Sequence, residues 1–372
     1  MDIKIATTGI ALLAIVAGAG AATTPATTVV ITNDTVLARD YYATTFKVKG
    51  DNIGVSLGGH TLYGTSEGQG AGKDKPHPLS VAFSVEGKNV TIRNGKIRQY
   101  KNGISIVTGL DYPSRAVAVE KWNRSPEEAR AYLETFYSKG SDGAMLLNLD
   151  IETYQIGVYV NPYVQNFRLL DSRINAQWIG IYLDTGVRHS AIQGNLFQNC
   201  GWNRYRFPKT LELYFPRLQE RGKGREAIAV DGALENLIYG NTFTNSNLAA
   251  ITLYSNCMEH FEDARSYPRI PGASFNRIVG NTFEDEEKAI WIASRQLRDL
   301  SKWGAGKPYI DGKYVMDDAK FNQVLGNTFQ NTRIAVEIAD DGNWIEGNTL
   351  NGASGVVSRK SDGSLPENTT VQ

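Results

Sequence analysis

The sequence lacks several features that would indicate common classes of protein. It holds 39 basic and 39 acidic residues, so its formal net charge is zero, and the excess of positive charge typical of nucleic-acid-binding proteins is missing. It contains no Gly-rich phosphate loop, no His-Glu-x-x-His and no Cys-x-x-Cys spacing. We therefore expect no nucleic-acid partner, and no site of these three kinds.

Cysteines and long apolar runs are also scarce. Cys200 and Cys257 are the two cysteines; in an exported protein they can form a disulfide, or they can be two small buried residues. The one notable apolar run lies in residues 1–22, after Lys4 and before small residues, which is typical of a secretory signal peptide. That run is shorter than the roughly 20 residues of a spanning helix. We expect a periplasmic or secreted protein with no membrane span after signal removal.

A short phrase, Gly-Asn followed by Thr or Leu and then Phe or Leu, recurs in the second half of the chain. Its five copies are 194–197, 240–243, 280–283, 326–329 and 347–350. Such spacing indicates one supersecondary unit stacked on itself. A solenoid grows in one direction without dividing into domains, so we expect a single domain over 23–358 and a C-terminal tail over 359–372.

Each repeat reads as short strands separated by corners. Residues 237–243 and 250–254 both alternate apolar and polar side chains, which is typical of strands. Ile151, Ile174 and Phe197 are 23 residues apart. A coil of that length with two or three strands predicts an all-β, right-handed parallel β-helix with loop insertions. We expect the last residue of the phrase to point inward and its Asn to form a ladder between coils.

Three early segments, 28–37, 51–62 and 89–95, resemble the opening coils of right-handed parallel β-helix proteins of the pectate-lyase-like superfamily. The resemblance covers about residues 28–358. It implies the β-helix fold and a polysaccharide ligand. That superfamily includes polysaccharide lyases, glycoside hydrolases, uronan epimerases and proteins without known activity, so the resemblance does not choose a reaction.

Four insertions interrupt the coils, at 108–143, 201–224, 255–275 and 294–321. We predict that all four leave from one corner of the stack, where loops on a rigid scaffold commonly bind ligands. In the first, residues 125–133 are typical of a short helix capped by Ser with Pro in its first turn. The second is rich in Arg, Lys and aromatic residues, which suits an acidic sugar polymer; alternatively, it packs its own rings over the coil wall.

Alternation along the later strand of each coil sends one set of side chains outward. It places Asp184 and Asp231 on adjacent coils, about 4.8 Å apart. Such a pair can bind Ca²⁺, serve a retaining glycosidase or neutralise a uronate while a base removes its C5 proton. Alternatively, the two acids are structural and are tied to a nearby Arg or to backbone amides.

The residues around this pair complete the predicted site. As further catalytic residues we assign His189, Tyr254 and Arg225, although His189 can equally be a surface residue. As substrate-binding residues we assign Arg188, Tyr159, Tyr182, Trp291, Arg295 and Glu226.

The sequence thus favours a monomeric, exported protein that cleaves an acidic, uronate-containing polysaccharide by β-elimination. Two alternatives remain. One is a glycoside hydrolase or uronan epimerase that uses the same two acids. The other is a non-catalytic glycan-binding or cell-envelope protein. Calcium is the one cofactor that the acid pair suggests.

Overall fold

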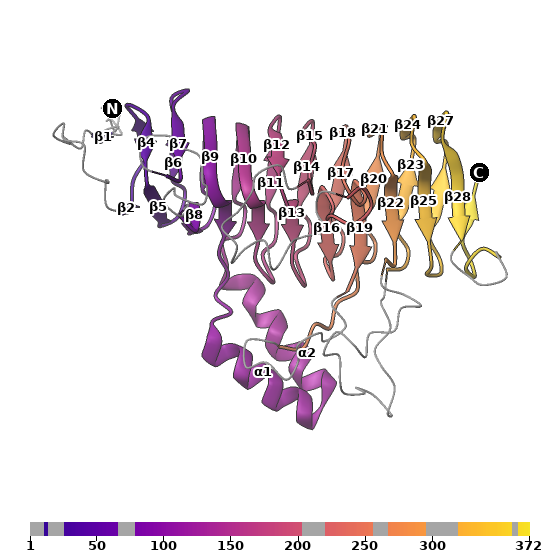
Figure 1. The fold of residues 1–372 in the computed structure, drawn as a ribbon. Coiled ribbons are helices and arrows are strands. Elements are labelled where there is room, and N and C mark those ends of the chain that lie inside the picture. Colours follow the sequence, from indigo (N-terminus) through magenta and orange to yellow (C-terminus); the bar gives the residue numbers. More distant parts are fainter. Residues whose placement is uncertain are drawn as a thin grey trace, which may run out of the picture.

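The computed structural model describes residues 11–13, 26–65, 79–202, 220–255, 267–294, 319–358 and 364–372. Every pairing between its strands is parallel, and the coils stack into one long column with the chain ends at opposite ends (Figure 1). Each full coil contributes one segment to each of three sheets, which confirms the predicted β-helix.

The strands fall into three parallel sheets, which the chain visits in the order 1, 2, 3. Sheet 1 contains β1 (Ala11–Leu13), β3 (Thr35–Leu37), β6 (Gly54–Ser56), β11 (Arg168–Leu170), β14 (Ala191–Gln193), β17 (Leu237–Tyr239), β20 (Arg277–Val279), β23 (Gln323–Leu325), β26 (Trp344–Glu346) and β29 (Thr370–Val371). Sheet 2 contains β4 (Tyr41–Tyr42), β7 (Thr61–Tyr63), β12 (Arg173–Ala176), β15 (Leu196–Gln198), β18 (Thr242–Thr244), β21 (Thr282–Glu284), β24 (Thr328–Gln330) and β27 (Thr349–Asn351). Sheet 3 contains β2 (Thr27–Ile31), β5 (Thr44–Lys49), β8 (Val81–Glu86), β13 (Ile179–Leu183), β16 (Ile228–Asp231), β19 (Ile251–Tyr254), β22 (Lys288–Ile292), β25 (Ile334–Ile338) and β28 (Ser354–Ser358). The long strands β9 (Thr91–Ile106) and β10 (Met145–Val160) bend through all three sheets.

The repeated phrase contributes to both the core and a corner of the stack. Its Phe residues lie in the core, and its Gly-Asn pairs form the corner between sheets 1 and 2. Phe197, Phe243, Phe283 and Phe329 are fully buried, and adjacent rings stack with centroids 4.8 to 5.0 Å apart. The fifth copy differs, because Leu350 is 47% exposed. Leu350 is in register with Phe329, so it continues the Phe column as predicted. It is exposed because no strand is stacked on the other side of β27 among the described residues.

The Asn residues of the phrase form the predicted ladder. The side-chain nitrogen Nδ2 of Asn241 donates to Asn281 Oδ1 at 3.0 Å and to the Ile192 carbonyl oxygen at 2.8 Å. Asn281 repeats this pattern toward Asn327 and Ile238. The glycine before Asn281 has a φ of 61°, a left-handed conformation that glycine adopts at little cost. The ladder therefore satisfies buried corner groups on successive coils.

The insertions leave from two corners, so the prediction of one common corner is wrong. Residues 108–143, 255–275 and 294–321 connect sheet 3 to sheet 1, whereas 201–224 joins β15 in sheet 2 to β16 in sheet 3. We call these positions the 3–1 corner and the 2–3 corner. The Gly-Asn phrase divides the first predicted strand of each coil between sheets 1 and 2, and 201–224 leaves at the next corner along the chain.

The first insertion lies beside the stack, below sheet 3 in Figure 1. It contains α1 (Tyr112–Arg124), α2 (Pro126–Glu134) and the 3-10 turn η2 (Thr135–Ser138). Ser125 caps α2 by accepting from two backbone amides, which confirms the predicted helix. Leu133 and Tyr137 of this insertion share a buried cluster with Tyr267 of the third insertion, so these two insertions support each other.

Both chain ends extend sheet 1 in the structure. β29 pairs with β26, so the expected tail includes a strand of the solenoid. Near the other end, β1 lies within the predicted signal peptide and pairs with β3; the signal peptide stays a prediction. Among the described helices, none has the length and apolar character needed to cross a membrane. Cys200 is buried, with Sγ 3.6 Å from the Ile174 carbonyl oxygen, and Cys257 lies outside the described residues.

Candidate functional site

The two predicted acids lie on adjacent coils with an arginine between them. Leu183 is paired with Val230 across β13 and β16, so Asp184 and Asp231 follow side by side, as the register predicts. Nη1 of Arg269 lies 2.7 Å from Asp184 Oδ1 and 3.2 Å from Asp231 Oδ2. Arg269 belongs to the third insertion and supplies the positive charge that a pair of neighbouring carboxylates requires.

Two phenols complete this acid cluster. The Tyr159 hydroxyl donates to Asp184 Oδ2 at 2.5 Å, and the Tyr182 hydroxyl donates to Asp231 Oδ2. Burial raises the pKa of both phenols well above the usual value, and the adjacent carboxylates raise it further. Both hydroxyls are therefore protonated near neutral pH and act as hydrogen-bond donors, so neither is suited to remove a proton from a substrate.

The two carboxylates of the acid cluster are closed to solvent, whereas Tyr159 and Tyr182 are half-buried. Asp184 is 1% exposed and Asp231 is 0% exposed. The charged contact with Arg269 matches the structural alternative more closely than the calcium site. Among the described residues, no three His, Cys, Asp or Glu side chains gather where they could hold a metal ion.

Arg269 is the principal member of the cluster that sequence reasoning missed. It lies 85 residues from Asp184 and 38 from Asp231 in the chain, within an insertion that has no repeat. The only available signal was indirect: two adjacent acids need a cation.

Three other predicted residues form a second buried group beside the first. The Tyr254 hydroxyl donates to Glu226 Oε1 at 3.1 Å, and Nε of Arg225 lies 3.7 Å from Glu226 Oε2. The Arg225 guanidinium also lies over the Trp178 ring. Tyr254 is paired with Asp231 across β16 and β19, so this group and the acid cluster are neighbours on sheet 3.

The remaining predicted residues do not join the acid cluster. His189 lies at the exposed 3–1 corner, with Nε2 2.8 Å from Glu235 Oε2. Trp291 is buried on sheet 3 under Nζ of Lys288, which is 3.6 Å from the ring centroid. Arg188 lies flat on the Tyr137 ring at 3.6 Å and donates to Gln165 Oε1. Arg295 lies outside the described residues.

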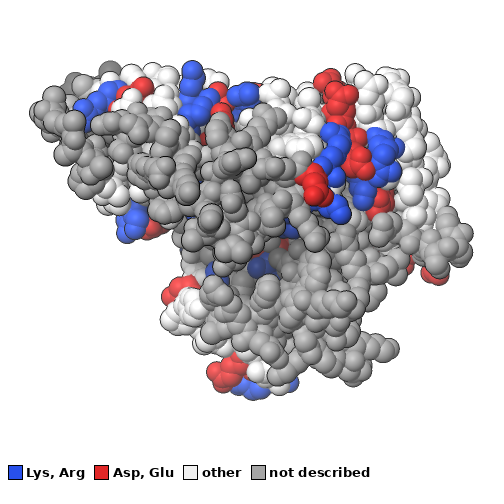
Figure 2. Space-filling model, in the orientation of Figure 1, with Lys and Arg blue, Asp and Glu red and all other residues white. Residues whose placement is uncertain are grey.

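Arg188 lines a pocket of about 280 Å³ at the 3–1 corner, which we call the corner pocket. The pocket lies between α2, the turns of successive coils and the segment that follows Arg269. Its charged and aromatic lining includes Arg130, Glu134, Tyr137, Arg188, Phe275, Lys320 and Phe321. Three of these side chains are basic and one is acidic. On the molecular face in Figure 2, by contrast, described charges of both signs are intermixed.

Phe275 and Phe321 are exposed aromatic residues at the rim of the corner pocket. They are 53% and 52% exposed, and their rings stack with centroids 5.2 Å apart. Both residues have left-handed backbones, with φ of 59° and 57°. This conformation is unusual for a bulky residue and favours Gly or Asn. The same left-handed conformation occurs at this corner of earlier coils, at Asn166, His189 and Glu235, so it belongs to the turn, and the exposed rings are what distinguishes these two positions.

Comparisons with known proteins show one family and several structures of the same general shape. An alginate lyase from Paenibacillus sp. str. FPU-7 is 12% identical, over 89% of this chain and 97% of its own, with a TM-score of 0.48. PfbA, a surface adhesin of Streptococcus pneumoniae, is 13% identical, over 91% and 73%, with a TM-score of 0.46. The tailspike protein of E. coli bacteriophage HK620 is 8% identical, over 87% and 49%, with a TM-score of 0.40.

These similarities are too distant to indicate a function, and a search of curated proteins gave no match. A family model gives a firmer assignment. The model described as periplasmic copper-binding protein (NosD) matches residues 116–354, which is more than half of the chain and includes the acid cluster and the corner pocket. This parallel β-helix protein therefore belongs to the NosD family.

Proposed function

We propose that this protein is a non-catalytic, periplasmic glycan-binding protein and that the corner pocket binds an acidic sugar unit. The observation that carries the proposal is the pocket's combination of two stacked, exposed rings with an excess of basic side chains. Aromatic rings present flat apolar faces to the C–H faces of sugars, and arginine binds carboxylates through paired hydrogen bonds.

The charge of the corner pocket favours a uronate over a neutral sugar. Arg130, Arg188 and Lys320 line this pocket together with Glu134, which leaves a formal charge of +2 from three bases and one acid. Stacking on Tyr137 and bonding to Gln165 fix the plane of Arg188 at the pocket wall. A guanidinium held in this way loses little conformational entropy when it binds an anion.

The buried acid cluster supports binding rather than β-elimination. A lyase needs a base that reaches the C5 proton of the sugar. Asp184 and Asp231 are buried against Arg269, and the two phenols beside them are held protonated. The lyase reaction is the second candidate, because the cluster contains acids, phenols and an arginine; it requires Arg269 to leave the acid pair.

The family name raises the question of copper. Copper sites in proteins use His, Cys and Met ligands. In the described part of the chain, His60 and His189 each lie beside a carboxylate and Cys200 is buried in the coil. No group of three His, Cys, Asp or Glu side chains gathers there. The described residues do not fit a copper site, and we derive no chemistry from that metal.

Calorimetric titration with oligomers of galacturonate and alginate, with neutral dextran as a control, tests the proposal. We expect binding of an acidic oligomer that weakens with added salt, because screening reduces the attraction between exposed charges. Arg188→Gln should weaken binding about 10- to 100-fold, the value of one charge-assisted hydrogen bond.

A matched control uses an exposed ring outside the pocket. Tyr239→Ala, which removes an exposed side chain of sheet 1, should leave affinity unchanged, whereas the double variant Phe275→Asn with Phe321→Asn should lose binding. Equal affinity in all these variants, or no binding of either acidic oligomer, would refute the proposal. New ultraviolet absorbance from unsaturated uronate would favour the lyase instead.

A further inference from the structure

A second pocket of about 280 Å³ lies at the 2–3 corner, at the other end of the sheet 3 strands from the corner pocket. It forms where β9 and β10 bend, and the pairing register of these strands shifts there, on either side of Thr153. Such irregularities turn side chains away from their regular directions. We call this site the bend pocket; nothing in the acid cluster contributes to it.

Two buried oxygen atoms on residues that line the bend pocket have no hydrogen-bond partner. They are Oγ1 of Thr153 and Oε1 of Gln177. Thr153 is 1% exposed and Gln177 is 3% exposed. A buried polar atom without a partner costs about 1–3 kcal/mol, so such atoms are uncommon in folded proteins. Two such atoms on residues that line one cavity favour a ligand that supplies hydroxyl groups. Because neither oxygen is open to the cavity in the free protein, both side chains must turn toward the ligand when it binds.

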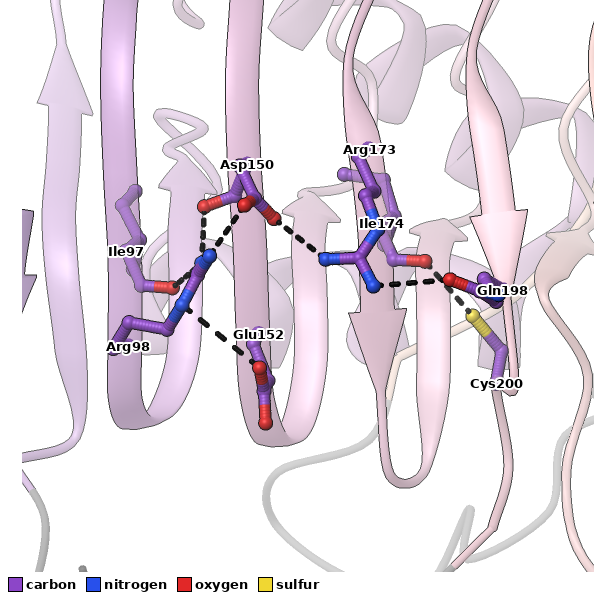
Figure 3. A network of polar contacts seen from close by, with 8 residues as sticks. All are labelled: Ile97, Arg98, Asp150, Glu152, Arg173, Ile174, Gln198 and Cys200. Carbon is purple, nitrogen blue, oxygen red and sulfur yellow. Dashed lines mark hydrogen bonds and ion pairs between the residues drawn. The ribbon is translucent and has the colours of Figure 1, made fainter. Parts of the chain in front are cut away.

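The charges around the bend pocket are balanced, in contrast to those of the corner pocket. Arg98 bonds to Asp150, and its Nε lies 3.8 Å from Glu152 Oε2 (Figure 3). Asp150 Oδ1 also accepts a hydrogen bond from Arg173 Nη1 at 3.2 Å, and Arg173 Nη2 donates a second one to Gln198 Oε1. The network contains two basic and two acidic side chains. Its formal net charge is zero, so it does not attract a charged ligand. The ligand expected here is neutral.

One wall of the bend pocket is aromatic. Tyr63 lines it, and its ring stacks on that of Tyr42 with centroids 5.0 Å apart and an angle of 5° between the planes. A flat ring surface beside hydroxyl acceptors suits a molecule with one C–H face and a rim of hydroxyl groups. The volume is near the lower limit of the roughly 300–1,000 Å³ typical of ligand pockets, which fits a single small ring.

We propose that the bend pocket binds one neutral sugar ring, with hydroxyl groups that donate to Thr153 Oγ1 and Gln177 Oε1 while the ring packs against Tyr63. This site is separate from the corner pocket in position, charge and ligand class. Its success or failure therefore does not depend on the binding of acidic glycans.

Saturation-transfer NMR and thermal shift with glucose, galactose, mannose and N-acetylglucosamine test this site. We expect at least one of these sugars to bind at millimolar concentration and to raise the melting temperature, because a ligand of the folded state stabilises it. Thr153→Val and Gln177→Met should each weaken binding about tenfold, through loss of one buried hydrogen bond. The variant Phe275→Asn with Phe321→Asn should bind the neutral sugar normally.

Stability provides the matched control. Because the two oxygens have no partner in the free protein, Thr153→Val and Gln177→Met should not lower the melting temperature. Thr332→Val, at the 2–3 corner of a later coil, removes a buried hydroxyl that does have a partner, the Gln330 carbonyl at 3.1 Å. It should lower stability and leave sugar binding unchanged. Failure of all four sugars to bind, or equal binding by wild type, Thr153→Val and Gln177→Met, would overturn the proposal.

Discussion

Replacement of Arg269 by Met is the most direct test of how the acid cluster is held together. Arg269 Nη1 contacts Asp184 and Asp231 at 2.7 and 3.2 Å, and both acids are buried. Met fills part of the same volume without charge. The variant therefore leaves two carboxylates facing each other without a cation.

Loss of one partner from a buried ion pair costs about 3–5 kcal/mol. We expect the cost to fall on local opening of the segment around Arg269, since an insertion can separate from a solenoid without unfolding its coils. The amide of Glu235, which donates to the Ser274 carbonyl at 3.1 Å, should then exchange with solvent about a hundred to several thousand times faster than in wild type.

The variant should also gain a dependence on pH. Without Arg269, the two carboxylates repel each other when both are ionised, and protonation of either one relieves that repulsion. The cost of the replacement therefore grows as pH rises and both carboxyls ionise. The deficit of Arg269→Met should thus be smaller near pH 4 than near pH 7.

Hydrogen exchange measured by mass spectrometry is the assay, with Arg277→Met as the control. Arg277 is an exposed arginine of β20 that contacts Gln323, so its replacement should leave exchange of the Glu235 amide unchanged. Adding Asp184→Asn and Asp231→Asn to Arg269→Met should restore part of the protection. Equal exchange in the Arg269 and Arg277 variants would refute the assigned role of Arg269.

Three further predictions concern stability. Burial raises the pKa of Glu286 to about 8. Its protonated form therefore stabilises the fold fully below pH 4.5, and this stability is lost as pH rises through 8, at about 1.4 kcal/mol per pKa unit. Urea unfolding at pH 5 and pH 9 measures this loss of stability, and Glu286→Gln should remove it. Asn281→Ala leaves several buried ladder groups without partners and should cost about 3–5 kcal/mol, whereas Asn348→Ala, at the less buried end of the ladder, should cost less; equal costs would contradict the ladder argument. The variant Phe275→Asn with Phe321→Asn should not lower the melting temperature, because relief of left-handed strain, about 1–2 kcal/mol per residue, offsets the lost ring stacking of about 0.5–1.5 kcal/mol; a clear drop on thermal melting would show that the rings are structural.

The positions of side chains were predicted correctly from the sequence wherever successive coils have the same residue pattern. Alternation with a period of two placed Tyr159, Tyr182 and Ala229 in one outward row, and the strand register confirms that row. The phrase predicted the buried Phe stack and the Asn ladder, because identical residues on identical coils meet at the same spacing. Leu350 continues the Phe column in register with Phe329 but is exposed, because no further strand covers it among the described residues.

The insertions were predicted less well, because they have no period to fix their position. The expected single corner was wrong for 201–224, which lies between a sheet 2 strand and a sheet 3 strand, whereas the other three insertions follow a sheet 3 strand. Residues 203–219, which include most of its basic and aromatic side chains, lie outside the described residues. Its role in binding acidic sugars therefore stays a prediction.

The sequence by itself determined the solenoid and the adjacency of Asp184 and Asp231, because backbone pairing between equal coils depends only on local pattern. The tertiary structure decided what surrounds those acids. Arg269 reaches them from an insertion far along the chain, and Phe275, Phe321 and Arg188 line one pocket only because the corners of successive coils and α2 converge there. Such contacts depend on the path of each loop in space, which no repeat in the sequence specifies.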